Sequence, residues 1–445
     1  MTTLRDIRDC FEGVIPSVVA TADAEGVPNV SYLSQVHFVD DHHVALSNQF
    51  LAKTARNVAQ TGRATALVID GLTGAQHELE LDFVASLTSG EVFDRMSAHL
   101  RALSTQHGME KVMRLHAAEL YRVASIRTVP VFGAEPPGAP PPRPPGERLA
   151  TAARVAAAVA EAPDPDAMID RTLDGLRDAF GFAYVMLFVP AAEGGRLTLL
   201  ASRGYETAGV GAEVTEGQGV IGIAAETRRP VRLCDVSRGV RMTEAVRRQS
   251  AWEDVRTIPL PGLAQPLSQL AAPMVVQGRL RGVLYAEAET RFAFGREDED
   301  AVALIGAQLA SGLLNAALVE MRTAAAPSLS PTAAVRDGAA FRVRYHRRDD
   351  SLFLDDEYLI KGVPGRLLCY FLQAHLETGR TEFTNREVRL DASLRLPDLK
   401  DNLETRLILL RRRLDEKQAP VRLTRPGRGR IGLSLDGAPR LNIAD

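Results

Sequence analysis

Hydrophobic and polar residues alternate along much of the first 134 residues, which is the pattern of half-buried β-strands. The alternating runs are short, and turn residues such as those of DAEGVP at 23–28 separate them. A helical stretch at residues 50–61 interrupts the series. We therefore expect residues 1–134, the N-terminal block, to form a small barrel of antiparallel strands. The expected strands span residues 15–22, 29–38, 44–47, 63–69, 78–89 and 121–131.

Residues 147–322, the middle block, mix helical and strand periodicity. Asp164 or Asp166, on either side of Pro165, is suited to cap the N-terminus of the second helix. The turn at Gln277 and Gly278 predicts a tight hairpin between two apolar strands. The block is expected to combine helices and strands. Its expected helices are 149–160, 166–180, 216–226 and 296–322, and its strands are 182–189, 196–202, 269–276 and 280–288.

Residues 341–445, the C-terminal block, predict three short strands, three helices and a hairpin, in that order. In the third helix, residues 396–417, leucines recur at spacings of 4, 4, 3 and 4, which predicts a core stripe. A second face carries Asn402, Arg406, Leu409 and Arg413. The expected strands are 341–345, 351–354 and 358–360, the first two helices are 364–377 and 385–390, and the hairpin is 421–435; the core leucines are Leu399, Leu403, Leu407, Leu410 and Leu414.

Two segments without regular periodicity separate the blocks. Residues 135–146, EPPGAPPPRPPG, are dense in proline and predict a stiff, extended linker. Residues 323–340 are small, polar and interrupted by Pro327 and Pro331, which indicates a flexible linker. The chain is thus expected to be a multidomain α+β protein with three domains.

Composition narrows the setting in which the protein works. The 445 residues include 3 cysteines, Cys10, Cys234 and Cys369, and these are too far apart in sequence for a zinc motif or a disulfide framework. A cytoplasmic location fits this cysteine usage best. We find no signal peptide and no apolar run of the roughly 20 residues that span a bilayer, so no membrane partner is expected.

Charge is distributed unevenly along the chain. The whole chain has a formal net charge of −3, whereas residues 395–430 contain 11 Lys and Arg against 5 Asp and Glu, a net charge of +6. A basic stretch on an otherwise acidic chain is typical of a surface that binds the phosphates of double-stranded DNA. A solvated charged face is the alternative reading of the same count. Arginine and asparagine on one helix face favour DNA, since these side chains pair with guanine and adenine edges. The expected DNA-binding residues are Asn402, Arg406, Arg411, Arg412, Arg413, Arg428 and Arg430.

The N-terminal block resembles the FMN-binding split barrels related to pyridoxamine-phosphate oxidases, centred on PNVSYLSQVHFVDDHHVALSNQFLAKTARNV at 28–58. The resemblance implies FMN as a cofactor, with its phosphate held where the third expected strand meets the following helix. Hydroxyls, amides, a lysine and free helix N–H groups suit a phosphate. The implied cofactor-binding residues are Ser47, Asn48, Gln49, Lys53 and Thr54.

This sequence departs from the split-barrel pattern in two ways. Many relatives carry an arginine where this chain has Asn29 to Ser31, and the basic substrate-binding tail of true oxidases has no counterpart. Substrate oxidation is therefore doubtful. Seven of the 9 histidines lie in this block, so haem remains an alternative to flavin, as does no cofactor at all.

The other two blocks also resemble known families. EGQGVIGIAAE at 216–226 followed by LAAPMVVQGRLRGVLYAEAE at 270–289 resembles a GAF domain, which implies an α/β sandwich with a pocket for a small-molecule ligand that the sequence does not identify, and often dimerisation through terminal helices. LETRLILLRRRLDE at 403–416 followed by LTRPGRGRIGLSL at 423–435 resembles the winged helix-turn-helix of response regulators. One departure is Leu409, where that family commonly has arginine.

The three resemblances together predict a one-component transcriptional regulator. It would sense a small molecule or redox state through the first two blocks and bind DNA through the third, as a homodimer joined along the helix at 296–322. A flavin-dependent oxidoreductase with accessory domains is the alternative, although no acid/base constellation or catalytic residue stands out near the flavin positions. Cys234 could act as a thiol sensor, but a buried, inert cysteine is the simpler reading.

Overall fold

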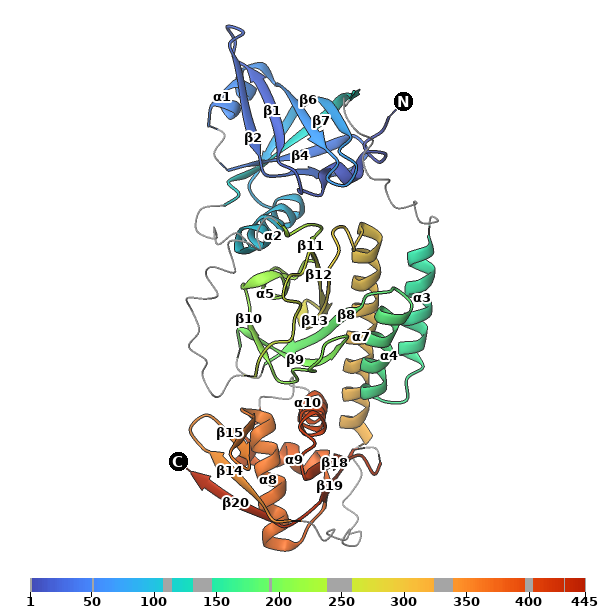
Figure 1. Cartoon of the computed structure of the whole chain (residues 1–445), viewed down its shortest axis with the longest axis vertical. Coiled ribbons are helices and arrows are strands. Elements are labelled where there is room, and N and C mark those ends of the chain that lie inside the picture. The colour runs from blue at the N-terminus through green and yellow to red at the C-terminus, as the bar shows by residue number, and fades with distance from the viewer. Residues whose placement is uncertain are drawn as a thin grey trace.

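The computed structural model describes residues 2–49, 52–106, 114–130, 146–191, 194–237, 258–323, 339–396, 403–427 and 429–444. The three blocks are stacked along the longest axis, with the N-terminal block at one end and the C-terminal block at the other (Figure 1). Each block contains its own β-structure, as the strands expected in all three blocks predict.

The N-terminal block is built on a seven-stranded antiparallel sheet with the order β2-β1-β5-β6-β7-β4-β3. The sheet is barrel-like and encloses an apolar core that includes Val19, Val44 and Leu79. The expected strand at 29–38 is in fact two strands, because Gln35 leaves the first pairing and exchanges hydrogen bonds with Ser47 on β4. The elements are β1 Ser17–Ala22, β2 Pro28–Leu33, β3 Val36–Phe38, β4 His43–Asn48, α1 Ala52–Thr61, β5 Arg63–Ile69, β6 Gln76–Leu87 and β7 Ala117–Val129, preceded by a 3-10 turn at Arg8–Phe11.

One helix of this block, α2 (Glu91–Gln106), was not expected from the sequence. It lies between the barrel-like sheet and the middle block (Figure 1). Met96 on α2 packs with Ala45 and Ala118 of the sheet. Ala98 and Ala102, in contrast, belong to the apolar core of the middle block. The two blocks therefore share buried surface.

The middle block has a six-stranded antiparallel sheet with the order β10-β9-β8-β13-β12-β11. Helices α3, α4 and α7 pack together, with α7 also contacting β12, whereas α5 packs against α2 and the sheet. Asp164 caps α4 as expected, since its carboxylate accepts a hydrogen bond from the Ala167 backbone N–H at 2.9 Å. The elements are α3 Glu147–Ala160, α4 Pro165–Asp178, β8 Tyr184–Pro190, β9 Arg196–Arg203, β10 Glu213–Thr215, α5 Gly219–Thr227, β11 Val231–Leu233, β12 Ser268–Val276, β13 Arg279–Ala288 and α7 Arg296–Thr323.

Helix α7 corrects the expectation that no segment has the length of a membrane span. Within the described residues, Arg296–Val319 is the one helical segment long and apolar enough to cross a membrane by length and composition. In the structure, α7 packs against α3, α4, β12 and β13. Its buried side chains, among them Ile305 and Leu309, belong to the core of the middle block.

The C-terminal block contains two sheets, with the orders β16-β15-β14-β20 and β17-β19-β18. The expected order of strands, three helices and a hairpin is confirmed, but β17 and β20 were not expected. Strand β20 pairs in parallel with β14 and is an edge strand of the first sheet. The elements are β14 Phe341–His346, β15 Ser351–Leu354, β16 Glu357–Ile360, α8 Val363–Thr378, β17 Glu382–Thr384, α9 Asn385–Leu390, α10 Leu403–Glu416, β18 Val421–Thr424, β19 Arg430–Leu435 and β20 Pro439–Ala444.

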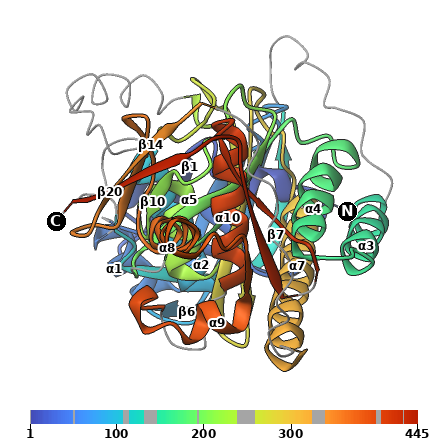
Figure 2. The ribbon, with the colours of Figure 1, turned by 90° about the horizontal axis from the view of Figure 1, so that it is seen from below.

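The middle and C-terminal blocks are in direct contact. One buried apolar cluster runs through both and includes Leu173 of α4, Phe371 of α8 and Leu409 of α10. Helix α10 lies beside β9 of the middle block, at the junction between the two blocks (Figure 1). Seen from below, it crosses the middle of the molecule (Figure 2).

Candidate functional site

The cofactor-binding residues inferred from the sequence lie where β4 leads into α1. Helix α1 begins at Ala52, so its first backbone N–H groups lack partners within the helix, as at any helix N-terminus. Lys53 is exposed in its first turn. This end of α1 can receive an anion through N–H groups and the lysine charge.

Two of the five residues are committed to contacts inside the fold. Ser47 is 2% exposed, and its hydroxyl oxygen accepts a hydrogen bond from the Gln35 backbone N–H at 3.1 Å. The Asn48 amide donates to Glu119 Oε1 at 2.9 Å. Both residues hold β4 in place instead of presenting free donors near α1.

Of the remaining residues, Lys53 and Thr54 lie in the first turn of α1, and Gln49 precedes this helix. Thr54 is buried, and its hydroxyl oxygen accepts a hydrogen bond from the Asn29 amide at 3.0 Å. The Gln49 Oε1 atom accepts from the Ser34 hydroxyl at 3.1 Å, while its Nε2 is buried with no hydrogen-bond partner in the described part of the chain. An orphaned amide donor, a hydroxyl and an exposed lysine near one helix end fit a phosphate group in their chemistry.

The expected core stripe of α10 is confirmed by burial. Leu403, Leu407, Leu410 and Leu414 are all 9% exposed or less, whereas Leu399 lies outside the described residues. The helix also contacts α8, β16 and β18 of its own block. This side of the helix holds the C-terminal block together.

The second face of α10, expected to be open for base contacts, is covered. Arg406 is 5% exposed, and its Nη2 donates to the Pro190 carbonyl of the middle block at 2.9 Å. Leu409 is 3% exposed. Arg413 is also buried and donates from Nε to the Leu359 carbonyl at 2.9 Å, within its own block. In this arrangement none of these three side chains faces solvent.

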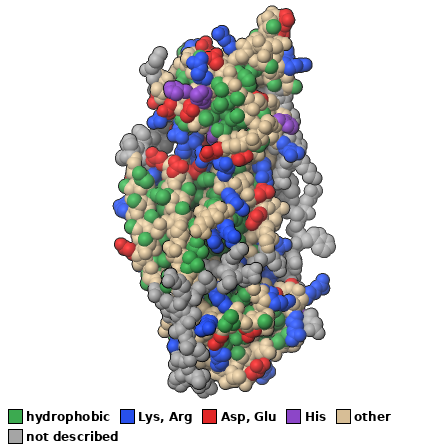
Figure 3. Space-filling view, turned by 180° about the vertical axis from the view of Figure 1, so that it is seen from behind, with side chains coloured by type: hydrophobic (Ala, Val, Ile, Leu, Met, Phe, Trp, Pro, Cys, Tyr) green, Lys and Arg blue, Asp and Glu red, His purple; other side chains and the backbone are tan. Residues whose placement is uncertain are grey.

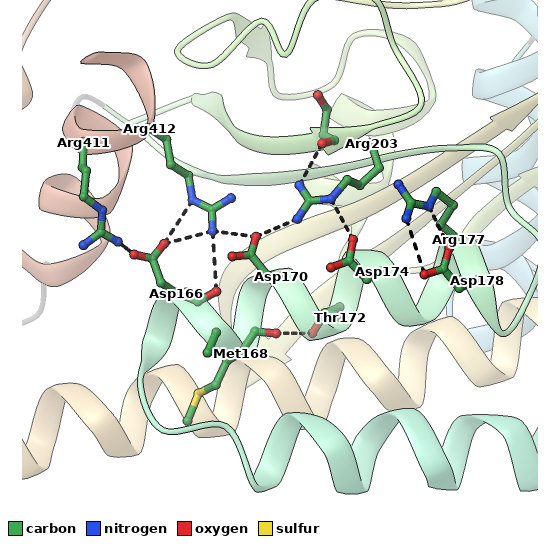
Figure 4. A network of polar contacts seen from close by, with 12 residues as sticks. Asp166, Met168, Asp170, Thr172, Asp174, Arg177, Asp178, Arg203, Arg411 and Arg412 are labelled. Carbon is green, nitrogen blue, oxygen red and sulfur yellow. Dashed lines mark hydrogen bonds and ion pairs between the residues drawn. The ribbon is translucent and has the colours of Figure 1, made fainter. Parts of the chain in front are cut away.

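The two neighbouring arginines are paired with carboxylates of α4 (Figure 4). Arg412 Nη2 lies 2.9 Å from Asp166 Oδ1 and 2.9 Å from Asp170 Oδ1. Arg411 forms an ion pair with the same Asp166. Burial lowers the pKa of Arg411, with the charge of Arg412 acting in the same direction. A basic pair expected to meet phosphates thus meets two protein carboxylates.

The hairpin residues behave differently. Arg430 on β19 is partly exposed, and its Nη1 lies 3.8 Å from the Glu382 carboxylate. Asn402 and Arg428, the other two expected DNA-binding residues, lie outside the described residues. On the face shown in Figure 3, Lys and Arg side chains are interspersed with Asp and Glu, and the described residues there form no single basic patch.

A buried polar cluster between the N-terminal and middle blocks was missed in the sequence. Glu12, Arg232 and Glu299 lie at its centre, with Arg232 Nη1 2.8 Å from Glu12 and Nε 3.1 Å from Glu299. These residues are 287 positions apart at the extremes, from Glu12 to Glu299, so sequence spacing carried no signal of their meeting. Burial opposes the charge of Glu12, but Arg232 and Arg296 outweigh it and lower the pKa of that carboxyl.

Two histidines border this cluster. Burial is the main reason why the pKa of His99 on α2 falls to about 4 and that of His37 to about 3. The His99 Nε2 atom is buried with no hydrogen-bond partner among the residues described. Both rings are therefore neutral at pH 7.

Cys234 adjoins the same cluster and is a buried thiol. It is 3% exposed, with its sulfur 2.8 Å from Arg232 Nη1 and 3.5 Å from Glu12 Oε2. Burial raises the pKa of this thiol well above its usual range, which disfavours the reactive thiolate. Within the described residues, no group of three or more His, Cys, Asp and Glu side chains could hold a metal ion.

Comparison with protein families identifies the first two blocks. Residues 4–124 match the family model described as pyridoxamine 5'-phosphate oxidase. Residues 164–313 match the GAF domain model. The chain thus contains a barrel domain of the first family and a GAF domain, as the motifs at 28–58, 216–226 and 270–289 predict. No curated protein matches the chain.

Solved structures resemble single blocks of the chain. The GAF domain of an Acinetobacter phosphoenolpyruvate-protein phosphotransferase is 20% identical, with a TM-score of 0.32, over 39% of this chain and 95% of that one. An FMN-binding protein from Syntrophomonas wolfei subsp. wolfei is 19% identical, with a TM-score of 0.24, over 28% of this chain and 90% of that one. Free methionine-R-sulfoxide reductase from Neisseria meningitidis is 20% identical, with a TM-score of 0.29, over 37% of this chain and 87% of that one.

Proposed function

We propose that this protein is a transcriptional regulator that binds double-stranded DNA through its C-terminal block, a winged helix-turn-helix domain, under the control of its first two blocks. The observation that carries the proposal is the arrangement of α8, α9 and α10 followed by the hairpin β18–β19. In the winged helix, the third helix enters the major groove and the hairpin contacts the backbone. Both elements carry arginines here.

DNA binding is tested with the full chain. Fluorescence anisotropy with a labelled duplex of mixed sequence, measured over a range of salt concentrations, should show affinity that falls as salt rises, because phosphate contacts release counterions. Affinity that does not depend on salt concentration would contradict DNA binding through phosphate contacts.

Arg430→Ala on the hairpin should weaken binding to all sequences alike and reduce the salt slope by about one. Arg440→Ala is the matched control, because it removes the same charge from β20, in the other sheet of the block. Equal losses in the two variants would mean that net charge, and not the hairpin, determines binding.

The GAF domain supports a sensor role, since such domains bind small molecules. We extend the proposal to FMN in the barrel domain, with its phosphate near the start of α1. Lys53, Thr54 and Gln49 would hold that phosphate, and the bound flavin would supply redox chemistry. Ser47 and Asn48 would support the site through β4, because their polar groups are already bonded there. The visible spectrum of the purified protein distinguishes flavin, haem and no cofactor.

The proposed regulator works in the cytoplasm as a homodimer joined through α7. Leu304 and Leu318, 14 residues apart on α7, lie on one face of the helix and are 46% and 44% exposed. Large exposed apolar side chains in a row on a helix are suited to packing against a second copy.

A further inference from the structure

The acidic side of α4 provides a substitute for DNA phosphates at α10. The side chains of Asp166 and Asp170, one helical turn apart, make three contacts with Arg412 that are between 2.9 and 3.1 Å long, and Asp166 also pairs with Arg411 (Figure 4). Carboxylates and phosphates both bind the guanidinium group through paired oxygens. The arginines cannot hold these carboxylates and a DNA backbone at the same time.

The contact also covers the face of α10 that base reading needs. Arg406 and Leu409 are buried, and Arg406 donates to the Pro190 carbonyl at the end of β8. A helix reads the major groove only when one of its faces can enter the groove, which is about 12 Å wide. With the middle block against it, α10 has no such face.

The far end of α10 is held by a second contact. Glu416 accepts hydrogen bonds from the backbone N–H groups of Gly209, at 2.7 Å, and Val210, at 3.2 Å. This loop packs tightly inside the middle block, where a Cβ atom on Gly209 would lie 2.3 Å from Pro261 Cδ. A shift of this loop in the GAF domain would therefore move α10 or break its hydrogen bonds through Glu416.

We propose that α4 and the Gly209 loop of the GAF domain mask α10, so that the arrangement described here is the form of the chain that does not bind DNA. This inference rests on the proposed function. DNA and the GAF domain compete for the same helix, and a ligand activates the protein by favouring the separated arrangement. The apparent DNA affinity of the chain is its intrinsic affinity multiplied by the fraction of molecules that are open.

The test is a full-length Asp166→Asn/Asp170→Asn variant, which keeps side-chain shape and removes both charges. It should bind a labelled mixed-sequence duplex about tenfold more tightly than the wild type, because a larger fraction of molecules is open. The matched control is Asp174→Asn/Asp178→Asn on the same helix. Each double variant removes two negative charges and one carboxylate partner of Arg203. In the control, however, Asp174 pairs with Arg203 and Asp178 pairs with Arg177, and neither pairs with α10.

A second measurement does not depend on DNA. Small-angle X-ray scattering should give a larger radius of gyration for Asp166→Asn/Asp170→Asn than for the wild type or the control. Unchanged dimensions, or DNA binding that is measurable and equally tight in the variant and the wild type, would overturn masking while leaving DNA binding intact. If the variant expands and still binds no DNA at low salt, the proposed function itself fails, and masking of a DNA-binding helix fails with it.

Discussion

Arg411 and Arg412 show that the type of a residue does not determine its binding partner. Their type and position in a basic stretch favour phosphate, yet the structure pairs them with Asp166 and Asp170. The guanidinium fork accepts carboxylate and phosphate in similar geometry, so residue type alone does not distinguish an intramolecular partner from DNA. Arg413 differs again, since its bond to the Leu359 carbonyl makes it part of the core of its own block.

The type of Lys53, at the start of α1, likewise fits a phosphate without identifying it, and the proposed contact with FMN can be tested directly. Lys53→Ala should weaken FMN binding severalfold and leave riboflavin binding, if measurable, much less affected, because the lost contact is to the phosphate. Titration of both ligands by flavin fluorescence measures the difference. Arg63→Ala, which removes an exposed cation beyond the other end of α1, is the control. Equal losses of FMN and riboflavin affinity would rule out a phosphate role for Lys53.

At the scale of elements, most strands and helices follow from periodicity, and the exceptions have physical reasons. Helix α2 was missed although it is amphipathic. It serves two cores, since Met96 packs against the barrel and Ala98 and Ala102 pack in the middle block. Strand β20 was missed because its partner, β14, lies about a hundred residues away, and such pairings carry no local signal. The cluster of Glu12, Arg232 and Glu299 escaped notice for the same reason.

The docking of α2 on the middle block should depend on pH through His99. Its pKa is lowered to about 4, mainly by burial, whereas a histidine released from the contact titrates near 6.5. The released form therefore binds more protons between these values, so the contact loses stability as pH falls from about 6.5 toward 4. At pH 5 the loss is about 1–2 kcal/mol. His37, with its pKa also lowered, acts in the same direction.

Thermal unfolding of His99→Gln measures this effect. The variant cannot gain the proton, so its transition temperature should fall less between pH 7 and pH 5 than that of the wild type. His42→Gln is the control, because His42 is exposed in the turn before β4. A pH dependence unchanged by His99→Gln would show that other groups control acid stability.

At the scale of the whole molecule, the GAF domain lies between the other two blocks and contacts both. It shares an apolar core with α2 on one side and with α10 on the other. Two resemblances found in the sequence, to the barrel and GAF domains, agree with the family matches. The way in which the blocks pack against one another, in contrast, could not be predicted from the sequence. This packing depends on surfaces from distant segments, such as Pro190 and Arg406, which periodicity does not connect.

The proposed dimer is a prediction at this scale. Leu304→Lys/Leu318→Lys should convert a dimer into a monomer, because two charges would be buried in the seam between copies of α7. Light scattering after size-exclusion chromatography gives the mass of each form. Leu376→Lys on α8, where the leucine is 49% exposed, is the control. A wild-type monomer would contradict the proposed homodimer, and a variant that remains dimeric would place α7 outside the seam.

The placement of α2 has a consequence for how such a chain can be assembled in evolution. A genetic crossover within the proline-dense linker at 135–146 would exchange the whole N-terminal block, including α2. Ala98 and Ala102, however, complete the core of the GAF domain from the far side of that linker. A newly acquired barrel would leave a hole there unless its own helix matched the surface of α5 and β11. The barrel and GAF domains should therefore be inherited as a pair.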